Sequence, residues 1–454
     1  MPETRPAGEP SLVRAVGVLG LAASIVNVTI GGGIFRLPAL VAASLHAAAP
    51  LSFLVCAAAM GLIVVCFAEA GKRVDLTGGP YAYVEVAFGS FAGFLAGVLV
   101  WLLGTLAVAA VSTIFADSVG ALVPLLAGPL GRAAVLIATF GALSAVNIRG
   151  VRQGTRLNAV ATAAKLLPLL LLIVVGAFAI RPANLALTEP VSAAAVARAS
   201  ILLIFAFCGV ESALVPSGEI KDVRRTVPRG ILLGMVVITA VYLAIQLVAQ
   251  GVLGPGLATE RAPLAAAAGK VFGPWGETML LVGATVSMFG YVSGMTLAVP
   301  RALFAFGRDG FLPRVVARVH PEYRTPHVAI ATQSVIVCIL AITSGFERLA
   351  ILANLSTLLL YAACCLAAWE LARRDPEVFS GAVAGATPAG AGISWVARRR
   401  WRASVVPLTA CAAILWLLTS ITREEWKIAC LVLAAASALF TLTGRARRRA
   451  RAAV

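Results

Sequence analysis

Charged residues are scarce in this chain. Asp, Glu, Lys and Arg make up 13% of its 454 residues, whereas roughly a quarter of the residues in an average soluble domain are charged. Hydrophobic residues reach 60%, and the stretches 60–68, 133–148, 166–180 and 231–259 contain no charge at all. A soluble fold has no interior large enough for that much apolar surface, and apolar runs near 20 residues suit a bilayer about 30 Å thick. The composition therefore predicts an all-α integral membrane protein.

The side chains that usually hold metals or carry out catalysis are also few. The three histidines lie far apart, and the eight cysteines lie in apolar segments without a CxxC pair, as small buried hydrophobic residues do. No nucleophile and base stand in a recognisable arrangement, and no loop is large enough to house an active site. The sequence therefore predicts no metal site, no cofactor and no enzymatic activity.

The apolar runs predict twelve membrane-spanning helices. The formal net charge is +17, but most of the 37 Lys and Arg residues fall in alternate connecting segments, as the positive-inside rule requires of cytoplasmic loops. The basic residues therefore indicate orientation, with both termini cytoplasmic, and they indicate contact with anionic lipid head groups and not with nucleic acid. The predicted spans are centred near residues 29, 58, 103, 140, 168, 204, 241, 290, 336, 358, 411 and 434.

The spans and the charge pattern divide the chain into six regions. Two groups of five spans form two halves, which are followed by a basic linker and two extra spans. The predicted regions are a cytoplasmic N-terminal tail (1–14), a first inverted repeat (15–182), a second inverted repeat (193–371), a basic cytoplasmic linker (372–403), spans 11 and 12 (404–443) and a basic cytoplasmic tail (444–454).

Three consecutive glycines interrupt the first span. A helix in hydrocarbon must satisfy its backbone groups internally, so Gly31, Gly32 and Gly33 are costly there unless the freed groups bind something. One interpretation is an unwound segment whose N–H groups bind a carboxylate at the start of the next half-helix. The other is close packing of small residues against a neighbouring span. Three glycines in a row exceed what packing needs, and they favour binding.

A second weak point lies in span 6, where residues 205–211 read Phe-Ala-Phe-Cys-Gly-Val-Glu. Its unwound carbonyls near residues 205–209 would accept hydrogen bonds from an ammonium group. Spans 1 and 6 occupy corresponding positions in the two halves, and interrupted helices at such positions indicate a midplane site in transporters built from inverted repeats. The two breaks together predict a site for a zwitterion. Phe205 suits a lid over that site, or it is one of the aromatic residues that face lipid or helices in any span.

Two ionisable residues lie in or beside these spans. Lys165 is well inside span 5, where an ammonium group costs a few kcal/mol and burial disfavours its charged form. It is either a proton carrier, which is the favoured interpretation, or a lysine that snorkels or is bonded to free carbonyls of span 1. Glu211 follows the second break, and it either binds a cationic substrate or a proton, or caps unwound backbone groups. The capping interpretation of Glu211 is favoured.

Several motifs in order along the chain resemble those of the amino acid-polyamine-organocation superfamily of transporters, over most of the chain to about residue 370. The motifs are Ile30-Gly31-Gly32-Gly33-Ile34-Phe35, Gly78-Gly79-Pro80-Tyr81 with Phe88-Gly89, the span 6 run 205–211, Gly218-Glu219-Ile220-Lys221 with Val227-Pro228-Arg229, the run 301–313 that reads RALFAFGRDGFLP, and Thr325-Pro326. Motifs that recur in the same order are more specific than any single one.

The resemblance implies the leucine-transporter fold, with a 5+5 inverted repeat, broken helices 1 and 6, and two extra helices. It implies a multi-pass protein of the bacterial inner membrane. It also implies that Lys165 stands in place of a sodium ion, as in sodium-independent members, which favours coupling to protons or exchange. The residues implied to meet the substrate are Thr29, Ile30, Gly31, Gly32 and Gly33 in span 1, and Phe205, Ala206, Cys208 and Gly209 in span 6.

The chain departs from the superfamily pattern at two positions. Gly32 stands where Ser, Thr or Ala is frequent, which removes a hydroxyl contact and enlarges the pocket. Arg36 follows the motif on the side of the outer vestibule, where it either attracts an acidic substrate or faces the lipid head groups.

The sequence as a whole predicts a secondary active transporter of L-amino acids that works by alternating access. One alternative is an exchanger of cationic amino acids or polyamines, with Glu211 as the counter-charge. Another, of a different class, is an amino acid sensor that binds its ligand without net transport.

Overall fold

The computed structural model describes residues 17–71, 74, 80–150, 155–187, 190–209, 223–374 and 393–444. Every regular element in these ranges is an α-helix or a 3-10 helix, which confirms the predicted all-α class. The N-terminal tail, most of the linker and almost all of the C-terminal tail predicted above lie outside the described residues. Glu211 and the motif at 218–221 also lie outside them.

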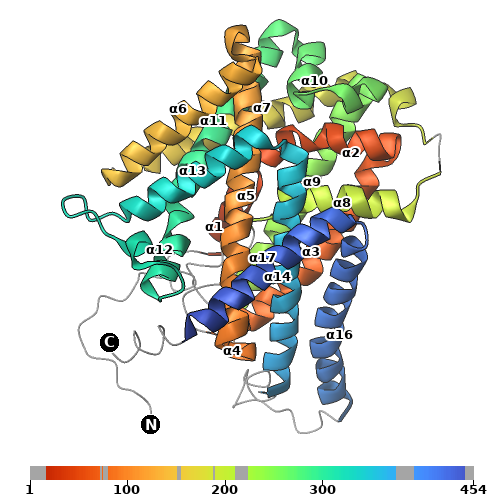
Figure 1. Ribbon diagram of the computed structural model, residues 1–454. Helices are drawn as coiled ribbons and strands as arrows, with labels where there is room; N and C mark the ends of the chain where they lie inside the picture. Colours follow the sequence, from red (N-terminus) through yellow and green to blue (C-terminus); the bar gives the residue numbers. More distant parts are fainter. Residues whose placement is uncertain are drawn as a thin grey trace.

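Helices fill the first half of the described chain and are shown in red to green in Figure 1. They are α1 (Val18–Thr29), η1 (Gly32–Phe35), α2 (Leu37–Leu45), η2 (His46–Ala48), α3 (Ala49–Gly71), α4 (Pro80–Phe88), α5 (Ser90–Leu122), η3 (Pro124–Leu126), α6 (Pro129–Ile148), α7 (Thr155–Gly176), η4 (Ala177–Ala179), η5 (Pro182–Leu185) and α8 (Ala193–Phe207).

The second half continues in the same way, and proline opens several of its helices, where the missing N–H group is not needed. These elements are α9 (Val223–Leu253), η8 (Gly254–Thr259), α10 (Pro263–Phe272), α11 (Pro274–Ala298), α12 (Pro300–Arg308), η9 (Arg314–Ala317), α13 (His327–Thr343), α14 (Phe346–Arg374), α16 (Ile393–Leu418) and α17 (Arg423–Leu442).

Seven helical segments of the described chain are long and apolar enough to cross a membrane, and six shorter apolar helices of 10–17 residues accompany them. The predicted span centres fall inside helices, and the one near residue 29 falls at the last residue of α1. The chain is therefore a helical multi-pass membrane protein. The number of twelve crossings stays a prediction.

Helix α5 is the long vertical helix at the centre of Figure 1, and it packs against α4, α11, α13 and α14. Glycines let two neighbours approach it closely. A Cβ atom at Gly93 would lie 2.6 Å from the Cβ of Glu85 in α4, and one at Gly104 would lie 3.0 Å from Val299 Cγ2 after α11. Both distances are shorter than an unstrained contact between carbon atoms. Larger side chains at these glycines would push α4 and α11 away from α5.

Polar side chains also connect α5 to α13 inside the bundle. Trp101 Nε1 donates to Gln333 Oε1 at 2.9 Å, and Gln333 Nε2 donates to Thr105 Oγ1 at 3.0 Å. Gln333 is buried, so its amide would be costly without these partners. The network fixes the orientation of the indole ring of Trp101 between α5 and α13.

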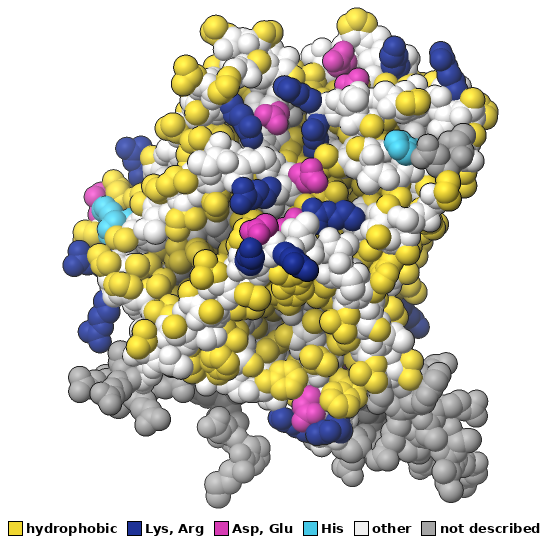
Figure 2. All heavy atoms as spheres, turned by 45° about the vertical axis from the view of Figure 1, so that its right-hand side comes forward, with side chains coloured by type: hydrophobic (Ala, Val, Ile, Leu, Met, Phe, Trp, Pro, Cys, Tyr) yellow, Lys and Arg dark blue, Asp and Glu magenta, His cyan; other side chains and the backbone are white. Residues whose placement is uncertain are grey.

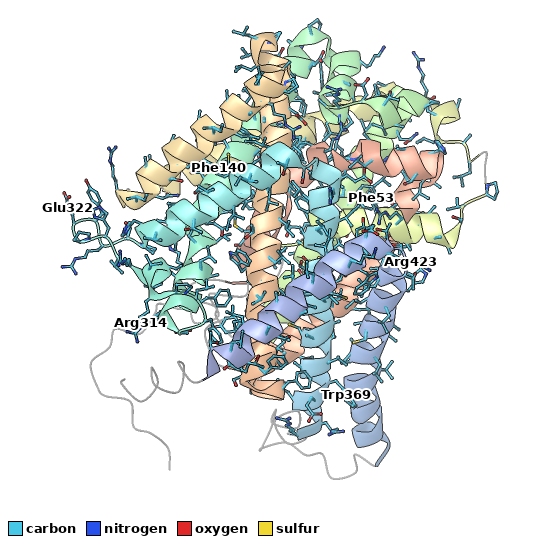
Figure 3. All side chains as sticks on the ribbon, in the orientation of Figure 1. Phe53, Phe140, Arg314, Glu322, Trp369 and Arg423 are labelled. Atoms are coloured by element: carbon cyan, nitrogen blue, oxygen red, sulfur yellow. The ribbon has the colours of Figure 1, made fainter. Side chains whose placement is uncertain are left out.

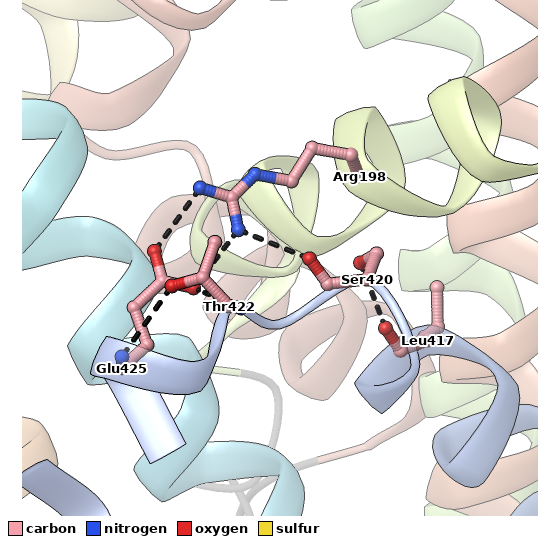
Figure 4. A network of polar contacts seen from close by, with 5 residues as sticks. All are labelled: Arg198, Leu417, Ser420, Thr422 and Glu425. Atoms are coloured by element: carbon pink, nitrogen blue, oxygen red, sulfur yellow. Dashed lines mark hydrogen bonds and ion pairs between the residues drawn. The ribbon is translucent and has the colours of Figure 1, made fainter. Parts of the chain in front are cut away.

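A second polar network connects α8 to the turn between α16 and α17, and Figure 4 shows it from close by. Arg198 donates to both carboxylate oxygens of Glu425 at 3.0 Å and to the carbonyl of Ser420 at 3.2 Å. Glu425 also accepts from the backbone N–H of Thr422, which completes a capping box at the start of α17. The two last helices are therefore attached to α8 by a bidentate ion pair.

The surface agrees with a membrane location. Figure 2 shows most Lys, Arg, Asp and Glu side chains in the upper half of one face and at its lower edge, and the area between them shows hydrophobic and other uncharged atoms with few charged side chains. In Figure 3, Arg314 and Glu322 lie at the periphery between α12 and α13, and Trp369 lies near the lower end of α14. The guanidinium carbon of Arg373 lies 5.4 Å from the centre of the Trp369 ring. Aromatic and basic residues of this kind are frequent at membrane interfaces.

Candidate substrate-binding site

The predicted break in the first span is present. Helix α1 ends at Thr29, Gly31 is extended, and a 3-10 turn begins at Gly32. A Cβ atom at Gly32 would lie 2.9 Å from Val111 Cγ1 and 3.0 Å from Met288 Cγ, and one at Gly33 would lie 2.8 Å from the ring of Phe205. At Gly31 the nearest atom would be the Thr29 carbonyl oxygen, 3.8 Å away. Close packing, which was one of the two interpretations of the glycine run, therefore applies to Gly32 and Gly33, whereas a Cβ atom at Gly31 would make only an ordinary van der Waals contact.

The predicted break in span 6 is present as well. Helix α8 ends at Phe207, Cys208 is extended, and Gly209 has a φ of 109°, in the left-handed region that favours glycine. A Cβ atom at Gly209 would lie 3.1 Å from Val28 Cγ1 of α1. The two interrupted helices therefore meet, although they are far apart in the sequence.

A tyrosine that the sequence did not single out holds the two breaks together. The hydroxyl of Tyr242, in α9, lies 3.0 Å from the carbonyl oxygen of Thr29 and 2.8 Å from that of Ala206. Both carbonyls belong to final helical turns, which have no partner further along the helix. Tyr242 is fully buried and packs edge-on against Phe207. Its single hydroxyl hydrogen can be donated to one carbonyl at a time. The hydroxyl lies within hydrogen-bond distance of both, so it is shared between the two chain breaks.

Lys165 serves a third carbonyl at the same helix end. Its Nζ donates to the carbonyl oxygen of Asn27 at 2.5 Å. Asn27 lies in the last turn of α1, so the break at Gly31 frees this carbonyl from an intrahelical bond. The sequence offered two interpretations of Lys165, and the contact agrees with a lysine bonded to span 1. Whether this ammonium also carries a proton stays a prediction.

The two breaks border one cavity of about 360 Å³, within the range of small-molecule sites. Eight of the nine predicted substrate residues line it, whereas Ile30 is buried beside it and does not. The described side chains around it include no charged residue. The lining residues are Val28, Thr29, Gly31, Gly32, Gly33, Val100, Trp101, Leu103, Gly104, Ala107, Val111, Phe205, Ala206, Cys208, Gly209, Tyr291, Met295, Ala298, Val299, Ala302 and Leu360.

One polar lining atom stands out, because Thr29 Oγ1 is buried and has no hydrogen-bond partner among the described residues. Buried hydroxyl groups normally have a partner. This oxygen lies at the end of α1, beside the freed backbone groups. A polar ligand in the cavity would satisfy it.

The cavity has different surroundings at its two ends. One end extends along α11 to Met295 and to Ala302 of α12. At the other end Phe205 lies against Gly33 and meets Phe346 edge-on, with 5.5 Å between ring centres. Phe205 is therefore placed where a lid would be, and its role as a lid stays a prediction.

Most of the wall was not predictable from the sequence. Trp101, Val111, Tyr291 and Met295 come from α5 and α11, and no local motif marks them. They reach the cavity only through the packing of α5 on α11. Arg36 does not line this cavity, and its Nη1 donates to the carbonyl oxygen of Glu260 at 2.8 Å.

Comparison with known proteins places these features in a family. The profile of the family described as amino acid permease matches residues 16–440. Three relatives from Bacillus subtilis (strain 168) are similar over most of their length. A methylthioribose transporter is 26% identical over 92% of this chain and 90% of its own. The branched-chain amino acid permease BcaP is 27% identical over 82% and 83%, and the serine/threonine exchanger SteT is 28% identical over 80% and 84%.

The match spans both helix breaks and the cavity between them. It confirms the resemblance to the amino acid-polyamine-organocation superfamily, and it agrees with a helical protein built around an internal binding cavity. The chain belongs to the amino acid permease family of membrane transporters, and it is a transporter and not an enzyme.

Proposed function

We propose that this protein is a secondary active transporter that moves L-amino acids with uncharged side chains across a bacterial inner membrane. The observation that carries the proposal is the meeting of two interrupted helices around one uncharged cavity. In this proposal the chain has twelve spans in the leucine-transporter arrangement, with inverted repeats at 15–182 and 193–371 and both termini in the cytoplasm. Alternating access then moves one group of helices relative to the other around the cavity.

The backbone at the breaks suits the charged groups of an amino acid. The first N–H groups of a 3-10 helix have no partner within that helix, so those at Gly32 and Gly33 are available for a carboxylate. A carbonyl oxygen has two lone pairs, so the Ala206 carbonyl at the end of α8 could accept a further hydrogen bond from an ammonium group beside the one from Tyr242. Thr29 Oγ1 is a further polar contact at the same place.

The rest of the cavity determines which side chains are accepted. Trp101, Tyr291 and Met295 give it an apolar and aromatic wall, and no described lining residue could neutralise a charged side chain. Moving an unpaired charge out of water costs several kcal/mol. A substrate with a neutral side chain therefore fits better than a cationic amino acid or polyamine. Glu211, the counter-charge of that alternative, lies outside the described residues.

Coupling in this proposal depends on Lys165 and not on sodium. The ammonium group donates a hydrogen bond to the carbonyl of Asn27 beside the first break. A cationic group therefore already stands at the position where a sodium ion could otherwise bind backbone carbonyls. Loss or gain of a proton at this amine would change the strength of its bond to α1, because hydrogen bonds from a charged donor are stronger than those from a neutral one. Protons or exchange would then drive transport.

The test is uptake by proteoliposomes that contain the purified protein, in buffers without sodium. The expected result is accumulation or exchange of at least one neutral L-amino acid with an apolar side chain, and little transport of arginine, lysine or polyamines. Empty liposomes and liposomes with Gly32→Val, whose larger side chain would enter the cavity wall, are the controls. Binding without uptake or exchange across a broad panel would refute transport and indicate a sensor.

A further inference from the structure

A second cavity lies above the first one along the same helices. Its volume is about 190 Å³, and it is bordered by the outer end of α5, η3, the start of α6, the start of α10, and α11. These elements meet at the upper end of the molecule in Figure 1. We call it the outer cavity. It is lined by Phe35, Ile114, Ala116, Asp117, Ser118, Gly120, Ala121, Leu126, Ala127, Arg132, Arg261, Ala262, Leu264, Ala265, Leu280, Leu281 and Ala284.

The short turn η1 separates the two cavities. Its first residues, Gly32 and Gly33, line the central cavity, whereas its last residue, Phe35, lines the outer one. On α5, Val111 faces the central cavity and Ile114 faces the outer one. A solute that enters from this end would therefore pass through the outer cavity before it reaches the central one.

The chemistry of the outer cavity differs from that of the central one, because charged side chains line it. Asp117 on α5 and Arg132 on α6 face Arg261, which stands before α10. Asp117 also lies within electrostatic range of Arg36. Arg36 donates to the carbonyl of Glu260, next to Arg261. One carboxylate, that of Asp117, and two guanidinium groups, those of Arg132 and Arg261, therefore line the cavity, and Arg36 lies beside it.

These charges are only loosely paired with one another. Arg132 Nε lies 3.5 Å from Asp117 Oδ1, beyond the 2.7–2.9 Å typical of a strong charge-assisted hydrogen bond. Arg132 Nε is buried and has no hydrogen-bond partner among the described residues. Arg261 lies within electrostatic range of Asp117, but it forms no ion pair within 4.0 Å among the residues that the structure describes. A carboxylate ligand would complete the partners of Arg132 and Arg261.

We propose that the outer cavity is a second, weaker binding site for a zwitterionic amino acid, which captures the substrate before η1 moves. The carboxylate would bind Arg261 and Arg132, and the ammonium group would bind Asp117. This proposal rests on the proposed transport function. The two sites then divide recognition, since the outer one binds the charges that all amino acids share and the central one accepts the side chain.

The first test measures transport from each side of the membrane. Arg261→Gln and Asp117→Asn should each raise KM for uptake into intact cells about tenfold, as expected when a hydrogen bond to a charged group is lost. KM measured in inside-out vesicles should stay unchanged, because the substrate then reaches the central cavity first. Arg181→Gln, which changes an exposed arginine at the same end away from both cavities, should change neither value. Equal values for wild type and both cavity variants on the outer side would overturn the proposal, as would equal rises on both sides.

The second test measures binding and does not depend on transport. Equilibrium dialysis of the detergent-solubilised wild type with a transported radiolabelled amino acid, or with leucine if none is transported, should give a stoichiometry of two with unequal affinities. Arg261→Gln should reduce it to one. The corresponding amine without a carboxylate should not compete at the weaker site. A stoichiometry of one in the wild type would overturn the outer site and leave the transport proposal intact. Two sites in a protein that transports nothing would support the outer site and refute transport.

Discussion

The three glycines of the first break offer a test in which neighbouring positions control for one another. Alanine adds the same methyl group at each, but the surroundings differ. At Gly33 the methyl would lie 2.8 Å from the ring of Phe205, which itself packs on Phe346. At Gly32 it would meet the side-chain atoms of Val111 and Met288 at 2.9 and 3.0 Å. At Gly31 it would meet only a carbonyl oxygen at 3.8 Å, and the extended backbone there suits any residue.

The distances set the expected order of effects. Forcing a methyl group into a packed interior costs about 1–3 kcal/mol, which corresponds to about 5- to 150-fold in an equilibrium constant. Gly33→Ala should fall at the upper end, because an aromatic ring held between two neighbours cannot move without repacking. Gly32→Ala should fall at the lower end, because both neighbours are aliphatic side chains that can change rotamer. Gly31→Ala should change stability by less than about 0.5 kcal/mol.

Thermal unfolding of the three purified variants in detergent, with substrate binding measured beside it, tests this order. Gly33→Ala should be the least stable and bind substrate most weakly. Gly31→Ala should unfold like the wild type. Equal losses at all three positions, or a greater loss at Gly31 than at Gly33, would refute the argument that close contacts require glycine at this break.

Four further substitutions test the polar contacts, and the last of them serves as a control. Tyr242→Phe keeps the ring but leaves the Thr29 and Ala206 carbonyls without their donor; we expect a loss of about 1–3 kcal/mol in stability and a raised KM, and an unchanged KM would contradict its role in positioning the breaks. Lys165→Ala should remove the pH dependence of uptake, and a pH profile like that of the wild type would exclude Lys165 from coupling. Arg198→Gln should destabilise by about 1–2 kcal/mol, since Glu425 stays largely buried without its bidentate partner. Lys427→Gln, which breaks an exposed pair, should cost less than about 0.5 kcal/mol in the same thermal unfolding assay.

The sequence predicted the features that follow from local chemistry. A glycine run in an apolar span cannot satisfy its backbone, so the break after Thr29 could be placed to within a residue or two. The second weak point was predicted at residues 205–211, and the left-handed Gly209 lies inside that range. The helical class followed from the scarcity of charge. These inferences needed no knowledge of which helices are neighbours.

Contacts between distant segments could not be predicted from the sequence, because they depend on which helices are neighbours. Tyr242 and Thr29 are 213 residues apart, and Trp101 and Gln333 are 232 residues apart. A tyrosine in an apolar run looks the same whether it faces lipid or a helix break. For Arg36 the sequence offered an acidic substrate or lipid head groups, and the structure places its guanidinium on the carbonyl of Glu260. That contact depends on where the η8–α10 connection folds back.

The end of α1 brings the proposed coupling group and the substrate cavity into one structural unit. Lys165 donates to the carbonyl of Asn27. Tyr242 donates to the carbonyl of Thr29, which lies two residues further along α1 and whose side chain lines the cavity. Tyr242 also reaches Ala206 in the second broken helix. A weaker bond at Asn27 would loosen the last turn of α1, and the Tyr242 bridge would transmit that change to α8. The path from the amine to both sides of the cavity consists of the Lys165–Asn27 hydrogen bond, one helical turn and the Tyr242 hydroxyl, which lies within hydrogen-bond distance of both broken helices. Protonation and substrate binding would therefore act on the same backbone groups, which is the physical requirement for two ligands to influence one another.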